Sequence, residues 1–339
     1  MSSRTAQVAI CTRHGNAREV VEIQAFDVPD PEPGFVRVQM RKAPINPSDL
    51  LFCTGNYGIG PETPTPVGLE GVGTVESSGG GWLGWLNKGK RVAVVTRVPG
   101  TWGTFCLTAS QMAIPVPNSI SDEQAAVYFI NPASALLMCR WILNIPADGW
   151  LMQSAAGSAL GRMVIRLGKH FGFRTLNLVR RPEQVAELKE LGADAVLVVD
   201  ESMPAVDFIP QVRSACNGSL PPFAIDPVGG ALGGLMLQGL GSGGRMLAYA
   251  SLAKAPTPVD PRILITRNLT YSSFWLGHAV ESLTLVKKVK MIHELSQLHQ
   301  QGLFQVETFS TYPLADVTLA LEAVESRQGG EKILLDLES

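Results

Sequence analysis

The segment from Trp150 to Arg181 constrains the fold of this chain more than any other. A short apolar run, Trp150–Gln153, leads into a turn of small residues, and an amphipathic pattern covers Gly161–Phe171. A second apolar run, Thr175–Val179, follows. This order predicts strand, turn, helix and strand, the unit from which parallel sheets are built. We therefore expect an α/β fold with a doubly wound parallel sheet.

The turn between the first strand and the helix has the composition of a phosphate-binding turn. It comprises Ala156, Gly157, Ser158, Ala159, Leu160 and Gly161. Small side chains let the backbone approach a pyrophosphate, and the free N–H groups and dipole of the helix attract its charge. Ala159 and Ser158 stand where glycines are often found, and similar turns occur in parallel sheets that bind nothing. The turn indicates a dinucleotide site only together with other features.

Two arginines, Arg180 and Arg181, follow the second strand. A site for NAD usually carries an acidic residue here, which binds the ribose 2′-hydroxyl. Guanidinium groups instead suit a 2′-phosphate, because they form charge-assisted hydrogen bonds with it. The sequence therefore predicts NADPH as the cofactor.

Composition excludes several classes of protein. The chain has 339 residues, enough for two domains, and its hydrophobic and charged fractions of 45% and 17% are those of a globular enzyme. A net charge of −2 without a basic stripe argues against a nucleic-acid partner. No apolar run is long enough to span a membrane, and the first residues lack an apolar signal core, so no membrane partner and a cytoplasmic location are expected. The five scattered cysteines are typical of reduced thiols.

The pattern of apolar residues along the sequence changes near residue 125. Before it, short alternating apolar runs broken by Pro and Gly predict a small β-barrel-like domain; after it, strands alternate with helices. A long helix is expected over about Ala279–His299, then a strand over Phe304–Phe309, and the tail returns to the first domain. The expected domains are 1–126 with 277–339, and 127–276.

Several motifs, in this order along nearly the whole chain, resemble the zinc-independent branch of the medium-chain dehydrogenase/reductase family. They are Ile45–Asp49, Gly55–Gly58, Gly68–Gly71, Gly100–Trp102, Asn131–Ala135, Asp226–Gly230 and Phe274–Leu276. Within that branch the sequence is most similar to quinone oxidoreductases and mitochondrial-type trans-2-enoyl-thioester reductases. The resemblance implies a GroES-like β-barrel catalytic domain and a Rossmann domain that binds NADPH.

The residues themselves argue against a catalytic metal. Zinc-dependent relatives carry a histidine in a G-H-E segment, where this chain has Gly68-Leu69-Glu70. A leucine side chain cannot coordinate zinc. Cys53 has no histidine near it in sequence, and a buried thiol is the simpler interpretation. We therefore expect no metal.

The resemblance also implies a set of site residues. Tyr57, in the G-x-Y motif of enoyl-thioester reductases, is the candidate proton donor, although a loop tyrosine could equally be a wall of the pocket. Asn46 could orient the cofactor amide or the substrate carbonyl. Further candidates for the cofactor site are Asp226, Tyr249, Phe274, Trp275 and Leu276, and those for the substrate pocket are Trp102 and Asn131.

The favoured function is hydride transfer from NADPH to a quinone or an activated C=C bond, as in a 2-enoyl thioester, enone or enal. Such a reaction spreads charge onto an enolate oxygen and needs a hydrogen-bond donor there, but no Lewis acid. The alternative is a non-catalytic NADPH-binding protein of structural or regulatory role. The apolar run Arg262–Phe274 predicts an edge strand that pairs across a two-fold axis, and hence a homodimer.

Overall fold

The computed structural model describes residues 4–58, 62–96, 100–200, 202–326 and 330–338. The chain forms two compact units, Met1–Ile130 with Val306–Ser339, and Asn131–Gln305. Within the described residues, no helix is long and apolar enough to cross a lipid bilayer.

The division differs from the expected domains, because residues 277–305 group with the second unit rather than the first. Side chains of the second unit hold this segment. The indole Nε1 of Trp141 donates to Glu294 at 3.3 Å, and Arg166 donates to the carbonyl of Gln305 at 2.7 Å. The return to the first unit therefore begins near residue 306 instead of 277.

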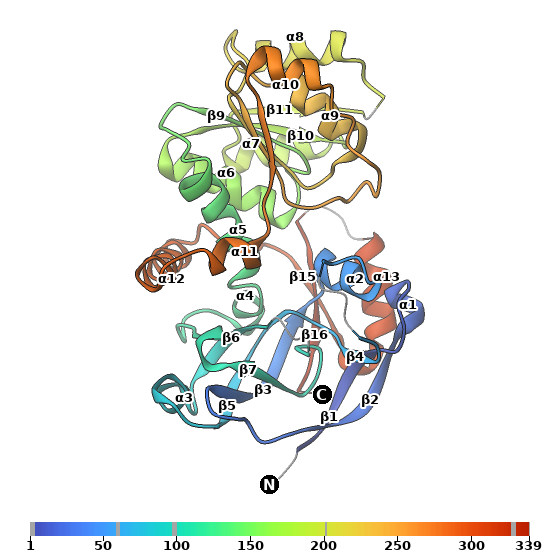
Figure 1. The fold of residues 1–339 in the computed structure, drawn as a ribbon, viewed down its shortest axis with the longest axis vertical. Helices are drawn as coiled ribbons and strands as arrows, with labels where there is room; N and C mark the ends of the chain where they lie inside the picture. The colour runs from blue at the N-terminus through green and yellow to red at the C-terminus, as the bar shows by residue number, and fades with distance from the viewer. Residues whose placement is uncertain (1–3, 59–61, 97–99, 201, 327–329, 339) are drawn as a thin grey trace. The chain divides into compact units, whose positions relative to one another are not determined.

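The first unit consists of two sheets (Figure 1). The smaller has the order β2 (Val21–Val28), β1 (Arg4–Cys11), β4 (Thr65–Pro66). The larger has the order β15 (Phe309–Pro313), β16 (Lys332–Asp336), β3 (Phe35–Pro44), β5 (Glu70–Ser78), β6 (Arg91–Val95), β8 (Ala113–Pro115), with β7 (Phe105–Ala109) also paired to β3. An isolated bridge pairs Val8 of β1 with Gly103, two residues before β7. The predicted barrel-like, GroES-like unit is confirmed.

Short helices cover the ends and one side of these sheets. They are α1 (Ala17–Val20), α2 (Pro47–Cys53), α3 (Trp82–Asn87), α4 (Asp122–Ala126) and α13 (Val317–Ser326), with 3-10 turns at Ser110–Met112 and Leu314–Asp316. The α13 helix packs against β15 and β16 and buries Ala320 and Leu321 in the core between the sheets.

The second unit contains a six-stranded parallel sheet. Its order is β11 (Ala195–Val198), β10 (Arg174–Val179), β9 (Trp150–Gln153), β12 (Phe223–Asp226), β13 (Arg245–Ala248), β14 (Thr270–Ser273). Counted from β9, this is 3-2-1-4-5-6, the order of a doubly wound dinucleotide-binding sheet. The predicted Rossmann sheet is confirmed.

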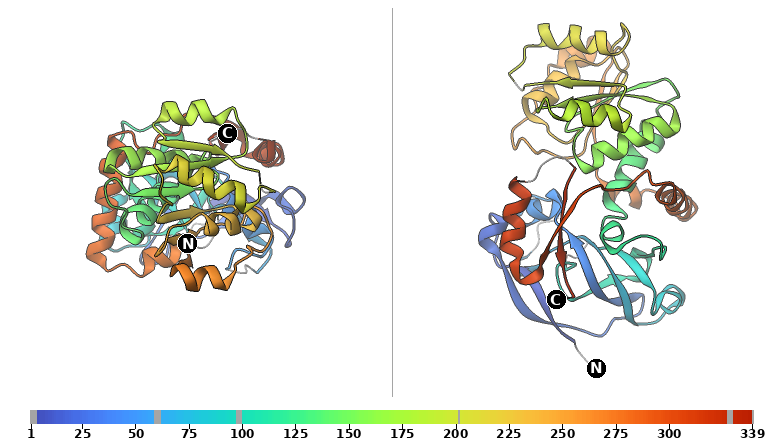
Figure 2. Two further views of the ribbon diagram at one scale, coloured as in Figure 1. Left: turned by 90° about the horizontal axis from the view of Figure 1, so that it is seen from above. Right: turned by 180° about the vertical axis from the view of Figure 1, so that it is seen from behind.

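Helices cover both faces of this sheet (Figure 2). On one face, α6 (Ala159–Phe171) and α7 (Gln184–Leu191) bury Ile165 and Leu188. On the other face, α8 (Ala205–Ala215) and α9 (Gly230–Gln238) bury Phe208 and Met236. The remaining helices are α5 (Ile130–Leu136), a π-helical turn at Leu137–Ile142, α10 (Pro261–Arg267), α11 (Leu276–Glu281) and α12 (Leu285–Gln300).

Three element predictions were wrong. The run Arg262–Phe274 is mostly the helix α10, because Asp260 caps it by accepting the N–H of Arg262 and Asn268 ends it with a left-handed φ of 51°. Only Thr270–Ser273 forms the edge strand.

The expected helix over 279–299 is interrupted, because the hydroxyl of Thr284 accepts the N–H of Lys287 and starts a new helix. The strand expected over Phe304–Phe309 begins only at Phe309. Before it, the side-chain amide of Gln124 takes the place of a strand partner: it donates to the carbonyl of Val306 at 2.7 Å and accepts its N–H at 3.2 Å.

Candidate dinucleotide-binding site

The candidate cofactor residues of the second unit follow the carboxyl ends of parallel strands. The turn at 154–158 follows β9, Arg180 and Arg181 follow β10, Tyr249 follows β13, and Phe274 follows β14; Asp226 is the last residue of β12. The carboxyl ends of parallel strands share one edge of the sheet, where doubly wound folds bind their ligands.

The turn after β9 presents a helix N-terminus. Ser158 is the N-cap of α6, and its Oγ accepts the N–H of Gly161 at 3.2 Å. The N–H groups of Ala159 and Leu160 lie in the first turn and have no acceptor within the helix. These donors, with the dipole of a 13-residue helix, form an anion site of the type that binds a pyrophosphate.

One glycine of the turn is fixed by close packing against backbone, and a second lies against the end of a side chain. A Cβ atom at Gly161 would lie 2.5 Å from the carbonyl oxygen of Ala156, so a side chain here would push the helix from the turn. A Cβ at Gly157 would lie 2.0 Å from Nε2 of Gln184. The methyl group of Ala159, by contrast, is partly exposed. The departure from a strict glycine pattern therefore falls where the packing is loosest.

Arg180 and Arg181 are both exposed, and neither forms an ion pair within the described part of the chain. Arg162 differs from them, because it is buried and paired. Its Nε donates to the carbonyl of Gly157 at 3.2 Å, and its guanidinium contacts Glu187 of α7 at 2.5 Å. Arg162 holds the turn, whereas Arg180 and Arg181 are available to a ligand.

The carboxylate of Asp226 joins two loops of this edge rather than facing solvent. One oxygen accepts the Ser154 hydroxyl and the Val228 N–H, and the other accepts the N–H of Gly229 at 3.0 Å. Asp226 is fully buried. Its side chain therefore aligns the β9 and β12 loops, which disfavours the predicted direct contact with a cofactor.

The other predicted residues at this edge differ in exposure. Phe274 is buried and donates its N–H to the carbonyl of Ala248 at 2.7 Å, while Trp275 and Leu276 are half-buried. The Trp275 ring packs edge-on against His278 at 4.4 Å between centroids. Desolvation raises the pKa of Tyr249, and the nearby Asp226 adds to the shift, so its phenol stays neutral.

In the first unit, Tyr57 lies in the loop after α2 and is half-buried. Glycines with left-handed φ values of 78° flank it at 55 and 58. A Cβ at Gly55 would lie 2.8 Å from Nδ1 of His14, so this loop is held against the segment that follows β1. The backbone on either side of Tyr57 thus requires glycine.

Asn46 belongs to a buried polar network. Lys332 Nζ donates to its Oδ1, its Nδ2 donates to Glu70 Oε2 at 3.3 Å, and its backbone N–H donates to Asp49 Oδ2 at 2.7 Å. All four side chains are at most 4% exposed. The amide is therefore engaged at both ends, and its second N–H is the one donor that it could offer to another group.

Glu70 and Asp49 also hold backbone groups. Glu70 Oε1 accepts the N–H groups of Phe129 and Ile130 at 2.9 and 2.7 Å, and Asp49 Oδ1 accepts the N–H of Leu69 at 3.1 Å. Burial raises the pKa of Asp49 to about 7, and it also raises the pKa of Glu70, while Lys332 opposes both shifts. No motif of the sequence indicated that Lys332 would join these residues.

The two predicted pocket residues are placed differently. Trp102 is fully buried in the core of the first unit, and its indole donates to the carbonyl of Pro44 at 3.1 Å. This position favours packing over the predicted role as a pocket wall. Asn131 is half-buried in α5, at the start of the second unit.

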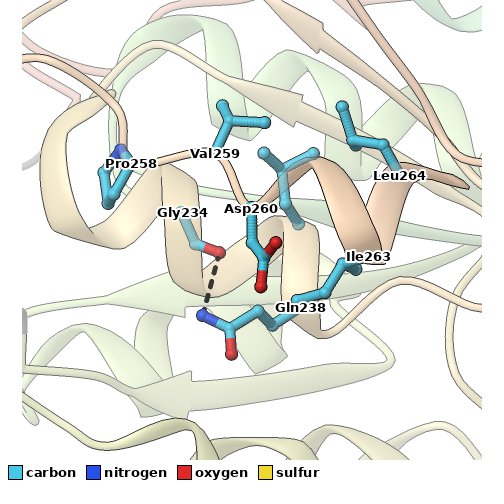
Figure 3. Close-up of a pocket in the computed structure, with 8 residues that line it drawn as sticks. Gly234, Gln238, Pro258, Val259, Asp260, Ile263 and Leu264 are labelled. Carbon is cyan, nitrogen blue, oxygen red and sulfur yellow. Dashed lines mark hydrogen bonds between the residues drawn. The ribbon is translucent and has the colours of Figure 1, made fainter.

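A cavity of about 310 Å³ lies elsewhere in the second unit, between the second half of α9 and α10 (Figure 3). Its lining residues are Gly234, Leu237, Gln238, Pro258, Val259, Asp260, Ile263 and Leu264. Asp260, the single acidic residue among them, is paired with Arg262 at 3.0 Å. The α9 helix runs away from the carboxyl edge of the sheet, so this cavity is separate from the turn after β9.

Ser154, Arg162, Gln184 and Lys332 were not predicted from the sequence. Only Arg162 has a local signal, because it stands among the apolar residues of an amphipathic helix. The others are recognised only from contacts between segments far apart in the sequence.

The sheet order and the turn define this chain as a dinucleotide-binding α/β protein with an appended barrel-like unit. Its sequence matches the family described as alcohol dehydrogenase GroES-like domain over residues 32–118, and that described as zinc-binding dehydrogenase over residues 159–291. The mitochondrial enoyl-acyl-carrier-protein reductase of Rattus norvegicus is 32% identical over 315 residues, which cover 91% of this chain and 83% of the relative.

Solved structures are also similar to this chain over nearly its whole length. One, described provisionally as an NADPH:quinone reductase of Bacillus thuringiensis, has a TM-score of 0.90 at 29% identity and covers 98% of this chain and 99% of its own. The complex of Etr1p with NADP and crotonyl-CoA has a TM-score of 0.83 at 25% identity, with 98% and 100% covered. The chain belongs to the medium-chain dehydrogenase/reductase family.

Proposed function

We propose that this protein is an NADPH-dependent reductase of an activated C=C bond or a quinone. The observation that carries the proposal is the small-residue turn and helix N-terminus after β9, together with two unpaired arginines after β10. Relatives of both activities support it: the rat protein is an enoyl reductase, and the Bacillus structure is described as a quinone reductase.

The residues of the second unit fit the cofactor. The first-turn N–H groups of α6 would bind the pyrophosphate, and Arg180 and Arg181 would bind the 2′-phosphate. NADPH, when bound, supplies the hydride that reduces the substrate. Arg162 and Asp226 fix the loops that present these groups.

The first unit would supply the proton chemistry. We propose that the phenol of Tyr57 donates a hydrogen bond to the developing enolate oxygen or supplies the proton for the α-carbon. Its motif favours a 2-enoyl thioester over a quinone, and the rat relative at 32% identity is an enoyl reductase. The remaining N–H of Asn46 would help to orient the substrate carbonyl or the cofactor amide.

We also propose that no zinc takes part. Leu69 stands in place of a histidine ligand and is buried, and among the described residues no three His, Cys, Asp or Glu side chains gather in a way that could hold a metal ion. The expected activity is therefore unchanged by exhaustive chelation.

The test is NADPH oxidation measured against a panel of 2-enoyl thioesters, enals and quinones, with and without a chelator. We expect turnover of enoyl thioesters in both arms. Turnover of quinones alone would select the second activity. Tight NADPH binding without turnover on any acceptor would favour the alternative, a non-catalytic NADPH-binding protein, and loss of activity on chelation would contradict zinc independence.

The cofactor preference is the first specific prediction. Replacing Arg180 and Arg181 with alanine should weaken NADPH binding by roughly ten- to a hundredfold, because a charge-assisted phosphate contact is worth about 1.5–3 kcal/mol. NADH binding should hardly change. Calorimetric titration of both nucleotides against both proteins measures this. Equal affinities of the unaltered protein for NADPH and NADH would refute the assignment.

The assembly is a second prediction. The short strand β14 leaves one edge of the six-stranded sheet uncovered within the described residues, and exposed edges tend to pair. We propose a homodimer that joins two such edges across a two-fold axis. Light scattering at micromolar concentration should report twice the chain mass of 36.3 kDa. A monomer under those conditions would count against the proposal.

A further inference from the structure

The side chain of Gln184 lies against the small-residue turn. Gln184 is the first residue of α7, and its Nε2 is the atom nearest to the position that a Cβ of Gly157 would occupy, at 2.0 Å. No side chain larger than hydrogen fits at residue 157 while the amide stays there. Glycine at residue 157 therefore leaves space for the Gln184 amide as well as for a ligand.

The amide of Gln184 has no side-chain hydrogen-bond partner among the described residues, although its backbone N–H donates to the carbonyl of Arg181 at 3.2 Å. The side chain is only partly exposed. The amide is in contact with solvent, and its N–H donors are available to a ligand that replaces this water.

The charges around Gln184 indicate which part of a ligand it would meet. Arg180 and Arg181 precede it by four and three residues and are unpaired. Of the acids on the same stretch, Glu187 is paired with Arg162, and Glu183 is exposed. The amide lies beside the small-residue turn, and it follows the two arginines in sequence at the same edge of the sheet. The adenosine ribose and its 2′-phosphate would bind at this edge.

We propose that Gln184 is a specificity-determining residue for NADPH, whose side-chain amide donates a hydrogen bond to the 2′-phosphate. This inference rests on the proposed function, because it needs NADPH to be the cofactor. The amide lies against Gly157, so it stands beside the turn that would bind the pyrophosphate. The two arginines supply charge, and Gln184 supplies an uncharged donor.

The test is the affinity of Gln184→Leu, which keeps the size of the side chain and removes the donor. NADPH and 2′,5′-ADP should each bind about tenfold more weakly than to the unaltered protein, the usual weight of a hydrogen bond to a charged group. NADH and 5′-ADP, which lack the 2′-phosphate, should bind within about twofold of the unaltered protein. Gln184→Glu should lose more NADPH affinity than Gln184→Leu, and the added loss should shrink with salt.

Gln238→Leu is the matched control. Gln238 is also a half-buried helical glutamine beside a glycine, since its Nε2 donates to the carbonyl of Gly234 at 3.5 Å, but it lies at the separate cavity (Figure 3). It should leave all four affinities unchanged. Thermal unfolding without nucleotide shows that each variant is folded.

The outcomes separate this inference from the function on which it rests. If the unaltered protein prefers NADPH but Gln184→Leu binds it equally well, or loses NADPH and NADH affinity alike, the inference about Gln184 is wrong and the proposed function stands. If the unaltered protein shows no preference for NADPH, both the inference about Gln184 and the proposed NADPH-dependent function are contradicted.

Discussion

Replacing Tyr57 with phenylalanine is expected to lower kcat on a 2-enoyl thioester by roughly 10²–10⁴-fold, the usual contribution of a positioned proton donor. The ring and its glycine-bounded loop remain, so the loss reports the hydroxyl alone. NADPH affinity should hardly change, because Tyr57 belongs to the first unit and the phosphate-binding groups belong to the second. Quinone reduction should suffer less, because a hydroquinone anion can take its proton from water.

Steady-state kinetics with both acceptors, together with NADPH titration, measure this. Tyr312→Phe is the matched control, since Tyr312 is also half-buried in the first unit but lies in β15. The Tyr312→Phe protein should reduce the 2-enoyl thioester with the kcat of the unaltered protein. An unchanged rate in Tyr57→Phe would mean that Tyr57 only lines the pocket, and the enoyl-reductase proposal would lose its main sequence support.

Replacing Lys332 with methionine should destabilise the first unit by about 3–5 kcal/mol, because it leaves two buried carboxyl groups without their cation. The loss should grow with pH. Burial already raises the pKa of Asp49 from 3.8 to about 7, and the pKa of Glu70 is also raised; without the ammonium both rise further. A carboxyl group whose pKa is higher in the folded state loses its stabilising contribution as pH rises through that value.

Thermal unfolding at about pH 5 and about pH 8 measures both effects. Lys42→Met is the control: Lys42 is paired with Asp336 at 3.3 Å, but the pair is partly exposed, and it should cost about 1 kcal/mol or less. Lys332→Arg should restore part of the stability. A Lys332→Met protein that is as stable as the Lys42→Met protein at both pH values would show that the network does not depend on its cation.

The architecture could be predicted well from the sequence, because the spacing of apolar residues differs between strands and helices and so indicates each element directly. The turn at 156–161 and the alternation of strands and helices indicated the second unit, and its sheet order confirms that prediction. The errors arose where capping residues override apolar patterns. Asp260 and Asn268 turn a run of branched residues into a helix, and Thr284 divides one long helix into two.

The candidate site was predictable only in part. Residues that would bind the cofactor through the backbone or through exposed charge, such as Gly157 and Arg180, belong to local motifs. Residues that act through long-range contacts do not: Lys332 contacts Asn46 across 286 positions of sequence, and no local pattern reports such a pair. Trp102 shows the converse, since its motif suggested a pocket and its burial places it in the core.

The buried ammonium group of Lys332 bears on how this scaffold could be redesigned. Asp49 and Glu70 share one buried cation, Lys332, and Asp49 accepts the backbone N–H of Leu69 itself. A histidine introduced at residue 69 would add a ligand but would leave this resident positive charge in place. A divalent cation at this position would then be repelled by a buried ammonium group whose charge water does not screen. A metal site at this position would therefore call for replacement of both Leu69 and Lys332.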